Sequence, residues 1–174
     1  MLKGDNVHLR AVEPSDVDFL YNCENNPENW RISHTLAPFT RDSIERYVSI
    51  EQDVFLYRQV RFIICINTGE PIGTIDLFEY DPIHLRAGVG ILIAEENDRN
   101  KGYATESLEL IIRYAFDHLM LETLFCNILE DNYVSLRLFE KRGFEVSGLK
   151  KNWIKTKDGM KNEFILQLLN NGIS

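Results

Sequence analysis

The sequence predicts an α+β fold in which helices flank a mixed, mostly antiparallel central sheet. Strand-like and helix-like segments are mixed along the chain, but short turns at Asn67–Glu70 and Asp81-Pro82 separate the apolar runs in its middle. Such turns join antiparallel neighbours, whereas a doubly wound parallel sheet needs a crossover helix after each strand. The chain has 174 residues and shows neither a repeat nor a linker, so we expect one domain over residues 1–174.

The first 50 residues are expected to form one strand and two helices. Apolar and polar residues alternate over Val7–Ala11, which is typical of a strand. Pro14 is a helix-start signal, and Pro27 breaks this first helix. Thr40 can cap a second helix with one apolar face. Between the helices, residues 30–39 are expected to be irregular and anchored by three apolar side chains, Trp30, Leu36 and Phe39.

The rest of the chain alternates between strand-like and helix-like periodicity. Apolar residues recur at helical spacing over residues 104–119 and 132–142, and Gly143 is suited to end the second helix. Strands are predicted at residues 60–66, 71–79, 85–94, 124–129, 144–146, 153–155 and 163–168. Two glycines in the third of these strands, Gly88 and Gly90, indicate a bulge or a close backbone approach.

The composition limits the classes of partner. The formal net charge is −8, which argues against a broad nucleic-acid surface because phosphate binding needs clustered Lys and Arg. The same charge is compatible with a cationic substrate, and equally with solubility alone. No apolar run approaches the ~18 residues that cross a bilayer, and the first residues lack the apolar core of a secretory signal, so we expect no membrane partner.

The cysteines and histidines predict neither a disulfide framework nor a metal site. The cysteines are odd in number and widely spaced, so we expect buried, reduced thiols of a cytoplasmic protein at Cys23, Cys65 and Cys126. The histidines are scattered without the spacing of metal ligands, at His8, His34, His84 and His118.

The most informative segment is the run from Arg99 to Ala104, between a strand-like run and the start of the 104–119 helix. The first N–H groups of a helix lack internal partners and carry partial positive charge, so a strand, a glycine turn and a helix in that order suit a pyrophosphate. Gly102 would let a ligand approach the backbone, and Arg99 and Lys101 add two cations. A solvated connecting loop is the common alternative, and the run matches neither the Walker A nor the Rossmann glycine pattern.

Two motifs resemble those of the GCN5-related N-acetyltransferase (GNAT) superfamily. Arg99-x-x-Gly102-x-Ala104 matches its first signature, and Asn132-x-x-Ser135 followed by Phe139-Glu140-Lys141-Arg142-Gly143-Phe144 looks like its second. The predicted order of elements is similar to that fold along nearly the whole chain. Segments such as Leu9-Arg10 and His84-Leu85-Arg86-Ala87 are similar to the branch that holds spermidine/diamine and ribosomal-protein N-acetyltransferases.

The resemblance implies acetyl-CoA as the co-substrate. Its pyrophosphate is expected on the backbone N–H groups of Arg99, Asn100, Lys101, Gly102, Tyr103 and Ala104. Its pantetheine arm is expected to pair with the strand edge at Ile91, Leu92 and Ile93, where a backbone N–H would also polarise the thioester carbonyl. Asn132 and Ser135 would contact the other side of the arm, and Lys141 the adenosine phosphates. Asn132 can also act as a plain helix N-cap.

The resemblance also implies acetyl transfer to an amine, which must lose a proton before it attacks. A primary amine has a pKa near ~10.4, so a carboxylate beside it could act as the general base. Glu79 is the first candidate, and Asp76 and Glu130 are alternatives. Each of the three could instead be a solvated charge at a strand end.

Phe139 departs from the family pattern. Many members carry a tyrosine there that protonates the departing thiolate, and phenylalanine has no proton to give. Ser135, Tyr133 or water could replace it, because a thiol of pKa ~8.5 leaves readily. Alternatively, the chain could be a non-catalytic acyl-CoA-binding protein.

The expected acceptor is a polyamine or diamine such as spermidine, and the alternative is the N-terminus of a ribosomal protein or another peptide. Its recognition is expected from the loop at residues 25–39 and the hairpin at 153–163, through Trp30, Phe39, Glu79 and Trp153. Members of this branch often form dimers or larger rings, which makes a homo-oligomer a family-based expectation.

Overall fold

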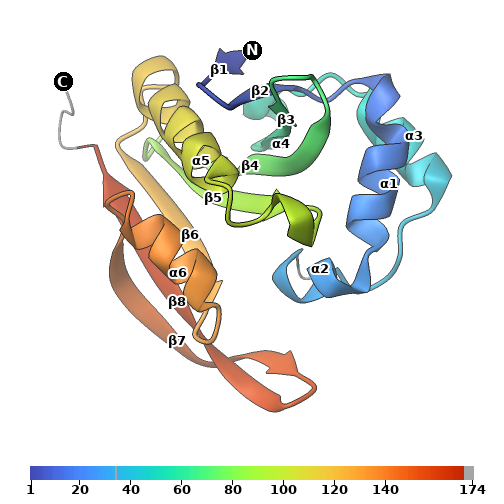
Figure 1. The fold of residues 1–174 in the computed structure, drawn as a ribbon. Coiled ribbons are helices and arrows are strands. Elements are labelled where there is room, and N and C mark those ends of the chain that lie inside the picture. Colours follow the sequence, from blue (N-terminus) through green and yellow to red (C-terminus); the bar gives the residue numbers. More distant parts are fainter. Residues whose placement is uncertain (34, 171–174) are drawn as a thin grey trace.

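One sheet organises the chain in the computed structural model, which describes residues 1–33 and 35–170 (Figure 1). Its described strands lie in the order β1-β2-β3-β4-β5-β6-β8-β7. All neighbours are antiparallel except β5 and β6. The bounds are β1 Leu2–Lys3, β2 Val7–Ala11, β3 Val60–Ile66, β4 Pro71–Asp81, β5 Arg86–Ile93, β6 Thr123–Leu129, β7 Glu145–Thr156 and β8 Gly159–Leu169. The predicted α+β class with a mixed, mostly antiparallel sheet is confirmed.

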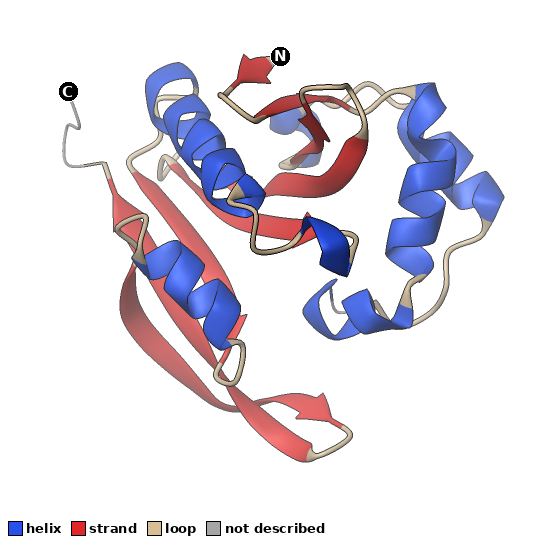
Figure 2. Ribbon diagram, viewed as in Figure 1, coloured by secondary structure: helices blue, strands red, loops and turns tan. Residues whose placement is uncertain are grey.

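Helices cover both faces of this sheet, and Figure 2 shows α5 and α6 in front of the strands with α1 and α2 to one side. Ile64 of β3 packs in the same core as Leu108 of α5. Its neighbour Ile63 points to the opposite face, where it packs with Leu20 of α1 and Ile44 of α3. The helices are α1 Val17–Asn25, α2 Pro27–Ser33, α3 Arg41–Ser49, α4 Val54–Tyr57, α5 Tyr103–Arg113 and α6 Tyr133–Glu140. Within the described ranges, no helix is long and apolar enough to cross a membrane.

The parallel pair β5 and β6 is joined only at one end. Arg86–Gly88 pair with Thr123–Phe125, although β5 continues to Ile93 and β6 to Leu129. Beyond these three residue pairs the two strands separate, and α5 and α6 each follow the separated end of one of them (Figure 1). This separation of β5 and β6, called the split below, therefore places the first residues of α5 and α6 at its open end.

A bulge in β4 lies beside this split. Phe78 pairs with Gly88 and Asp81 pairs with Arg86, so Glu79 and Tyr80 together oppose a single residue of β5. Glu79 has a φ of +50°, in the left-handed region. A Cβ on Gly88 would lie 2.4 Å from the Phe78 ring, which confirms the predicted close approach at this glycine.

The prediction for residues 30–39 is wrong in part. Pro27 ends α1 but begins α2, because Pro suits the first turn of a helix and the side chain of Asn26 accepts the N–H of Glu28. Leu36 and Phe39 are 98% and 41% exposed, so they are not core anchors. Residue 34 of this predicted loop lies outside the described residues.

Three further elements differ from the sequence-based expectation. The predicted 104–119 helix is α5 followed by a π-helical segment at Tyr114–His118. The segments predicted at 144–146 and 153–155 belong to one long strand, β7, with an irregular register between Lys150 and Ile154. The short helix α4 is not predicted, because its four apolar residues are too few to show a period.

Candidate active site

A pocket of about 380 Å³ lies where β5 and β6 separate. Its walls come from β3, β4, β5, β6, β8 and α6 with its N-cap. The lining residues are Arg61, Asp76, Phe78, Glu79, Val89, Gly90, Ile91, Cys126, Asn127, Ile128, Leu129, Asn132, Ser135, Phe139 and Glu163. This set contains Glu79, Ile91, Asn132 and Ser135, which the sequence places at the reaction centre. The structure therefore brings together residues from three predicted segments.

The β6 side of strand β5 offers backbone groups to a ligand. Residues 89–93 of β5 pair with β4 on one side, but their other side has no pairing with β6. Ile91 lines the pocket, whereas Leu92 and Ile93 lie beyond it along the same strand. An extended amide-bearing chain could complete the ladder there, as a peptide does at a sheet edge.

The start of α5 has the geometry of an anion cradle. Gly102 is its N-cap residue, with a φ of +87° and no side chain to cap the helix. The first helical bond runs from the N–H of Glu106 to the carbonyl of Gly102, so the N–H groups of Tyr103 and Ala104 precede the bonded part of the helix. A Cβ on Gly102 would meet no atom within 4 Å, so the space in front of these N–H groups is open. These residues fit a pyrophosphate group.

Arg99 contributes differently from the sequence-based expectation. Its N–H donates to the carbonyl of Glu96 at 3.0 Å within the turn. Its guanidinium donates to the carbonyl oxygens of Ile93 and Ala94 at 3.3–3.4 Å. Arg99 therefore ties the cradle to the end of β5, and the available donors of the predicted run begin at Asn100.

Lys101 faces the rim of the cradle. Its Nζ lies 3.0 Å from the carboxylate of Asp98, and this hydrogen bond raises the pKa of Lys101. The ammonium also lies 5.8 Å from the centre of the Tyr103 ring. It stays a cation at neutral pH and adds to the field of the helix terminus.

The beginning of α6 forms the opposite wall. The side chain of Asn132 accepts the N–H of Ser135 at 3.2 Å, so Asn132 is an N-cap as well as a pocket residue. Phe139, one turn further, is buried and meets Phe144 edge to face at 5.0 Å. Lys141 is exposed at the other end of the helix and lies outside the lining set.

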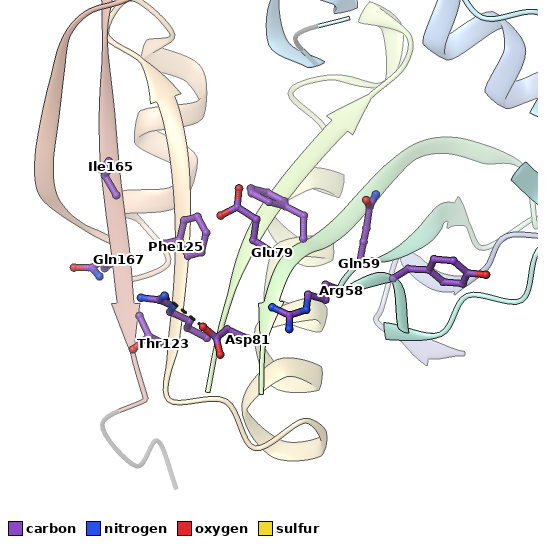
Figure 3. Close-up of a pocket in the computed structure, with 11 residues that line it drawn as sticks. Arg58, Gln59, Glu79, Asp81, Thr123, Phe125, Ile165 and Gln167 are labelled. Carbon is purple, nitrogen blue, oxygen red and sulfur yellow. Dashed lines mark hydrogen bonds and ion pairs between the residues drawn. The ribbon is translucent and has the colours of Figure 1, made fainter. Parts of the chain in front are cut away.

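Among the three candidate bases, Glu79 is the carboxylate that the surrounding residues do not hold. The bulge turns it toward the reaction pocket and toward a second pocket beside it (Figure 3). Glu130 is fixed by the N–H and the side-chain amide of Asn162, each at 2.9 Å. In the described part of the chain, the Glu79 carboxylate has no such donor.

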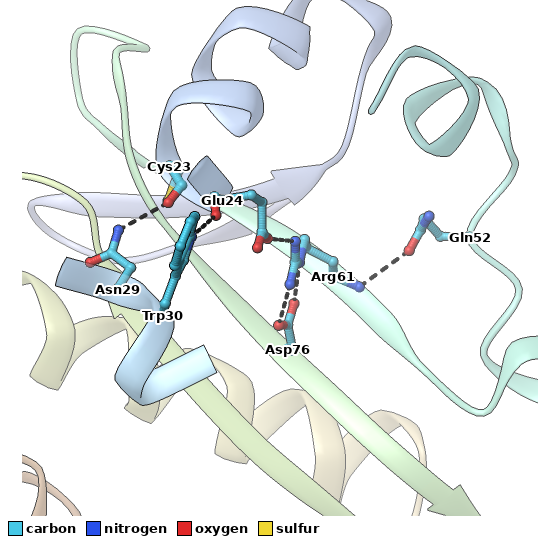
Figure 4. Close-up of polar contacts among 7 residues, drawn as sticks. All are labelled: Cys23, Glu24, Asn29, Trp30, Gln52, Arg61 and Asp76. Atoms are coloured by element: carbon cyan, nitrogen blue, oxygen red, sulfur yellow. Dashed lines mark hydrogen bonds and ion pairs between the residues drawn. The ribbon is translucent and has the colours of Figure 1, made fainter. Parts of the chain in front are cut away.

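Asp76 is held by an arginine. Arg61 donates to both carboxylate oxygens of Asp76, at 2.7 and 2.9 Å, and to Glu24 at 2.5 Å (Figure 4). Burial alone would lower the pKa of Arg61, but the attraction and hydrogen bonds of Asp76 hold it well above the usual value. The trio carries one net negative charge, and two of its members, Arg61 and Asp76, line the pocket.

The aromatic residues predicted to bind the acceptor lie apart from the pocket. Trp30 is half-buried and donates its ring N–H to the carbonyl of Glu24 at 2.8 Å (Figure 4). Trp153 is 58% exposed on the hairpin, with the ammonium of Lys150 at 5.3 Å from its ring. Neither they nor Phe39 line the two pockets, so Glu79 is the predicted acceptor residue that does.

Two charged residues of the pocket are not among those predicted from the sequence. Glu163 is 3% exposed and its carboxylate lies 3.0 Å from the Nζ of Lys150, which also donates to Asn127 at 2.9 Å. Arg61 is the second. Both occupy strand positions whose parity faces the pocket, and a charged residue inside an apolar strand is the signal that could have found them.

An anion cradle at a helix start, an open strand edge and a carboxylate above the split define an acyl-CoA-dependent acyltransferase. The family model described as acetyltransferase (GNAT) domain matches residues 6–145. The chain therefore belongs to the GNAT family and is an acetyl-CoA-dependent N-acetyltransferase, as the sequence motifs predict.

Named relatives and solved structures agree with this assignment. The chain is 30% identical over 159 residues to the uncharacterized N-acetyltransferase YoaA of Bacillus subtilis, covering 88% of each protein. It is 28% identical over 152 residues to spermidine N(1)-acetyltransferase of Escherichia coli, covering 85% of this chain and 77% of the relative. The fold matches spermidine N-acetyltransferase of Vibrio cholerae in complex with CoA and spermine, with a TM-score of 0.84, 22% identity and coverage of 94% and 95%. A dodecameric structure of that enzyme matches with a TM-score of 0.79 at 23% identity, over 94% and 93% of the two chains.

Proposed function

We propose that this protein acetylates the primary amine of a small acceptor, with a polyamine or diamine such as spermidine as the first candidate. The observation that carries the proposal is Glu79, a carboxylate turned by a bulge into the pocket at the split between β5 and β6. The names of the relatives support a polyamine. Three carboxylates in the pocket wall, Asp76, Glu79 and Glu163, support a cationic acceptor.

Glu79 is the proposed general base. The acceptor amine arrives mostly protonated and must lose a proton to attack, so an unheld carboxylate beside the acceptor can take it directly or through water. The open β6 side of β5 is proposed to orient acetyl-CoA, which supplies the acetyl thioester. Ser135 lines the same pocket, and we propose that its hydroxyl donates the proton that the departing sulfur takes up.

A peptide N-terminus is the second candidate acceptor. Arg58 and Arg86 line the adjoining pocket, and their charge disfavours an additional ammonium there. We also propose that residues 1–174 act as one acetyltransferase domain in the cytoplasm, which the three free, buried cysteines support. The dodecamer of the Vibrio cholerae enzyme supports a homo-oligomer.

The test is acetyl transfer measured by mass spectrometry with separate pools of polyamines, diamines and peptides. We expect product with at least one pool, and a Glu79→Gln variant with kcat lowered by about 100-fold or more while acetyl-CoA still binds. Glu145→Gln, at an exposed position of β7, is the matched control and should keep full activity. Acetyl-CoA binding without product from any pool would contradict the proposal.

A further inference from the structure

A second pocket, of about 740 Å³, adjoins the reaction pocket and shares Phe78 and Glu79 with it. The shared Phe78 ring covers Gly88 and meets Phe125, which lines the second pocket, edge to face at 5.7 Å. Figure 3 shows Arg58 and Gln59 on one side of this pocket, Thr123 and Gln167 on the other, and Glu79 and Asp81 between them. An acceptor whose amine reaches Glu79 can therefore extend its remote end into this space.

The remote part of this pocket is positively charged. Arg58 and Arg86 both line it, and Asp81 is their acidic neighbour. Asp81 is already engaged: it accepts the N–H groups of Ile83 and His84 at 3.0 Å, and its Oδ2 lies 2.8 Å from the ring Nδ1 of His84.

One of the two arginines is paired within the pocket. Arg86 donates to Oδ2 of Asp81 at 3.4 Å in an ion pair. The guanidinium of Arg58 forms no hydrogen bond or ion pair within residues 1–33 and 35–170. Arg58 and Arg86 against Asp81 leave one net positive charge in the remote part of the pocket, and Glu79 at the other end carries the opposite charge.

The backbone around the pocket is held in unusual conformations. Arg58, Glu79 and Leu85 all have a φ of 50–53°, in the left-handed region that non-glycine residues seldom adopt. The N–H of Tyr80 donates to the carbonyl of Arg58 at 3.0 Å, which links Arg58 to the bulge that presents Glu79. Such conformations persist where the surrounding structure fixes them, and they cluster at ligand sites.

We propose that this pocket is the subsite for the remote end of the acceptor, and that Arg58 and Arg86 select a carboxylate there. The inference rests on the proposed amine acetyltransferase function but differs from it in the acceptor: the names of the relatives favour a polyamine, whereas this pocket favours a primary amine that carries a carboxylate, such as an amino acid or an acidic peptide. The remote ammonium of a diamine meets two like charges in the same place, so it is disfavoured. Tyr57, Phe78 and Phe125 supply an apolar wall for the intervening methylene groups.

The test compares three acceptors of equal length that differ only at the remote end: 5-aminopentanoate, pentylamine and 1,5-diaminopentane. We expect the kcat/KM for the carboxylate to exceed that for the diamine. Arg58→Gln and Arg86→Gln should each reduce this ratio about fivefold to tenfold, the size of one partly exposed charged hydrogen bond. Arg58→Lys should retain most of the preference, and Arg113→Gln, at an exposed site on α5, should retain all of it.

A preference for the diamine that both Arg→Gln variants leave unchanged would overturn the subsite. A binding measurement separates this failure from failure of the proposed function. Nuclear magnetic resonance shifts of the Nε–H groups of Arg58 and Arg86 should move when 5-aminopentanoate is added to the protein loaded with CoA. Movement of both signals without acetylation of any amine would support the subsite and contradict the proposed function. Acetylation of an amine without a shift of either arginine signal would support the proposed function and contradict the subsite.

Discussion

Arg61 donates two parallel hydrogen bonds to the carboxylate of Asp76, from Nε at 2.7 Å and from Nη2 at 2.9 Å. Both side chains are 18% exposed, and the pair joins β3 to β4 at the wall of the reaction pocket. A planar guanidinium that meets a carboxylate in this way fixes distance and orientation together. Asp76 is therefore part of the frame of the site, whereas Glu79, three residues later, is left available for chemistry.

Asp76→Ala should destabilise the fold because it leaves Arg61 with Glu24 as its remaining partner. Breaking a largely buried pair by removing one member costs about 2–4 kcal/mol. Urea unfolding at pH 7 measures this loss. Asp42→Ala is the control: it breaks the exposed Arg46–Asp42 pair, whose side chains are 72% and 75% exposed, and should cost less than about 1 kcal/mol. Equal losses in the two variants would contradict this role.

Gly102→Ala should weaken acetyl-CoA binding more than it weakens the fold. The left-handed backbone at φ +87° costs about 1–2 kcal/mol with alanine, and the added methyl group meets no protein atom within 4 Å. The methyl group does occupy the open space before the N–H groups of α5, so the KM for acetyl-CoA should rise about tenfold or more.

Gly69→Ala separates the two effects. Gly69 has a similar φ of +92° and an equally open surrounding, but it lies in the turn between β3 and β4. It should show the same loss in thermal stability with an unchanged KM. A Gly102 variant that binds acetyl-CoA normally would remove this turn from the proposed cradle.

Ser135→Ala should lower kcat by less than about tenfold, because a thiolate of pKa near ~8.5 leaves without strong assistance at pH 8. If Ser135 delivers the proton, adding Phe139→Tyr to that variant places a phenol in the same pocket wall and should restore kcat. The pH–rate profile of the double variant should also gain an alkaline limb from the phenol. Phe144→Tyr adds the same hydroxyl to a ring that does not line the pocket, and it should not rescue.

Glu106 should make stability depend on pH. Burial alone would raise its pKa, but the N–H and side-chain amide of Asn6, at 2.8 and 3.0 Å, and the N–H of Val7 lower it. A carboxylate with a depressed pKa stabilises the fold above its unfolded pKa near ~4.3, and this contribution is lost as the pH falls through the folded value. Unfolding free energies measured from pH 7 to pH 3 should fall less steeply for Glu106→Gln than for the wild type. Glu51→Gln, at an exposed loop position, should leave the slope unchanged.

The sequence predicts the fold and the two helix starts beside the pocket better than it predicts the surroundings of the proposed acceptor residues. Periodicity and two motifs locate the strands, α5 and α6, since local spacing determines where an apolar face and a helix start fall. Glu79 could be named as a candidate, but the bulge that turns it depends on how β4 pairs with β5, a contact between strands that local spacing does not show. The acceptor roles predicted for Trp30 and Trp153 rest on their aromatic type and on their places in a loop and a hairpin, whereas their partners in the structure are Glu24 and Lys150.

The three residue pairs between β5 and β6 also have a mechanical consequence. They are the strand pairing that joins two parts of the sheet. The first part contains β1 to β5, and the second part contains β6, β8 and β7. A ligand bound between the two parts contacts both, so its binding free energy stabilises the folded state in which they are joined. By mass action, the unfolding temperature therefore rises with acetyl-CoA concentration, and amide hydrogen exchange in β6, β8 and β7 slows. The resistance of this protein to unfolding is thus set in part by the metabolic supply of its own acetyl donor.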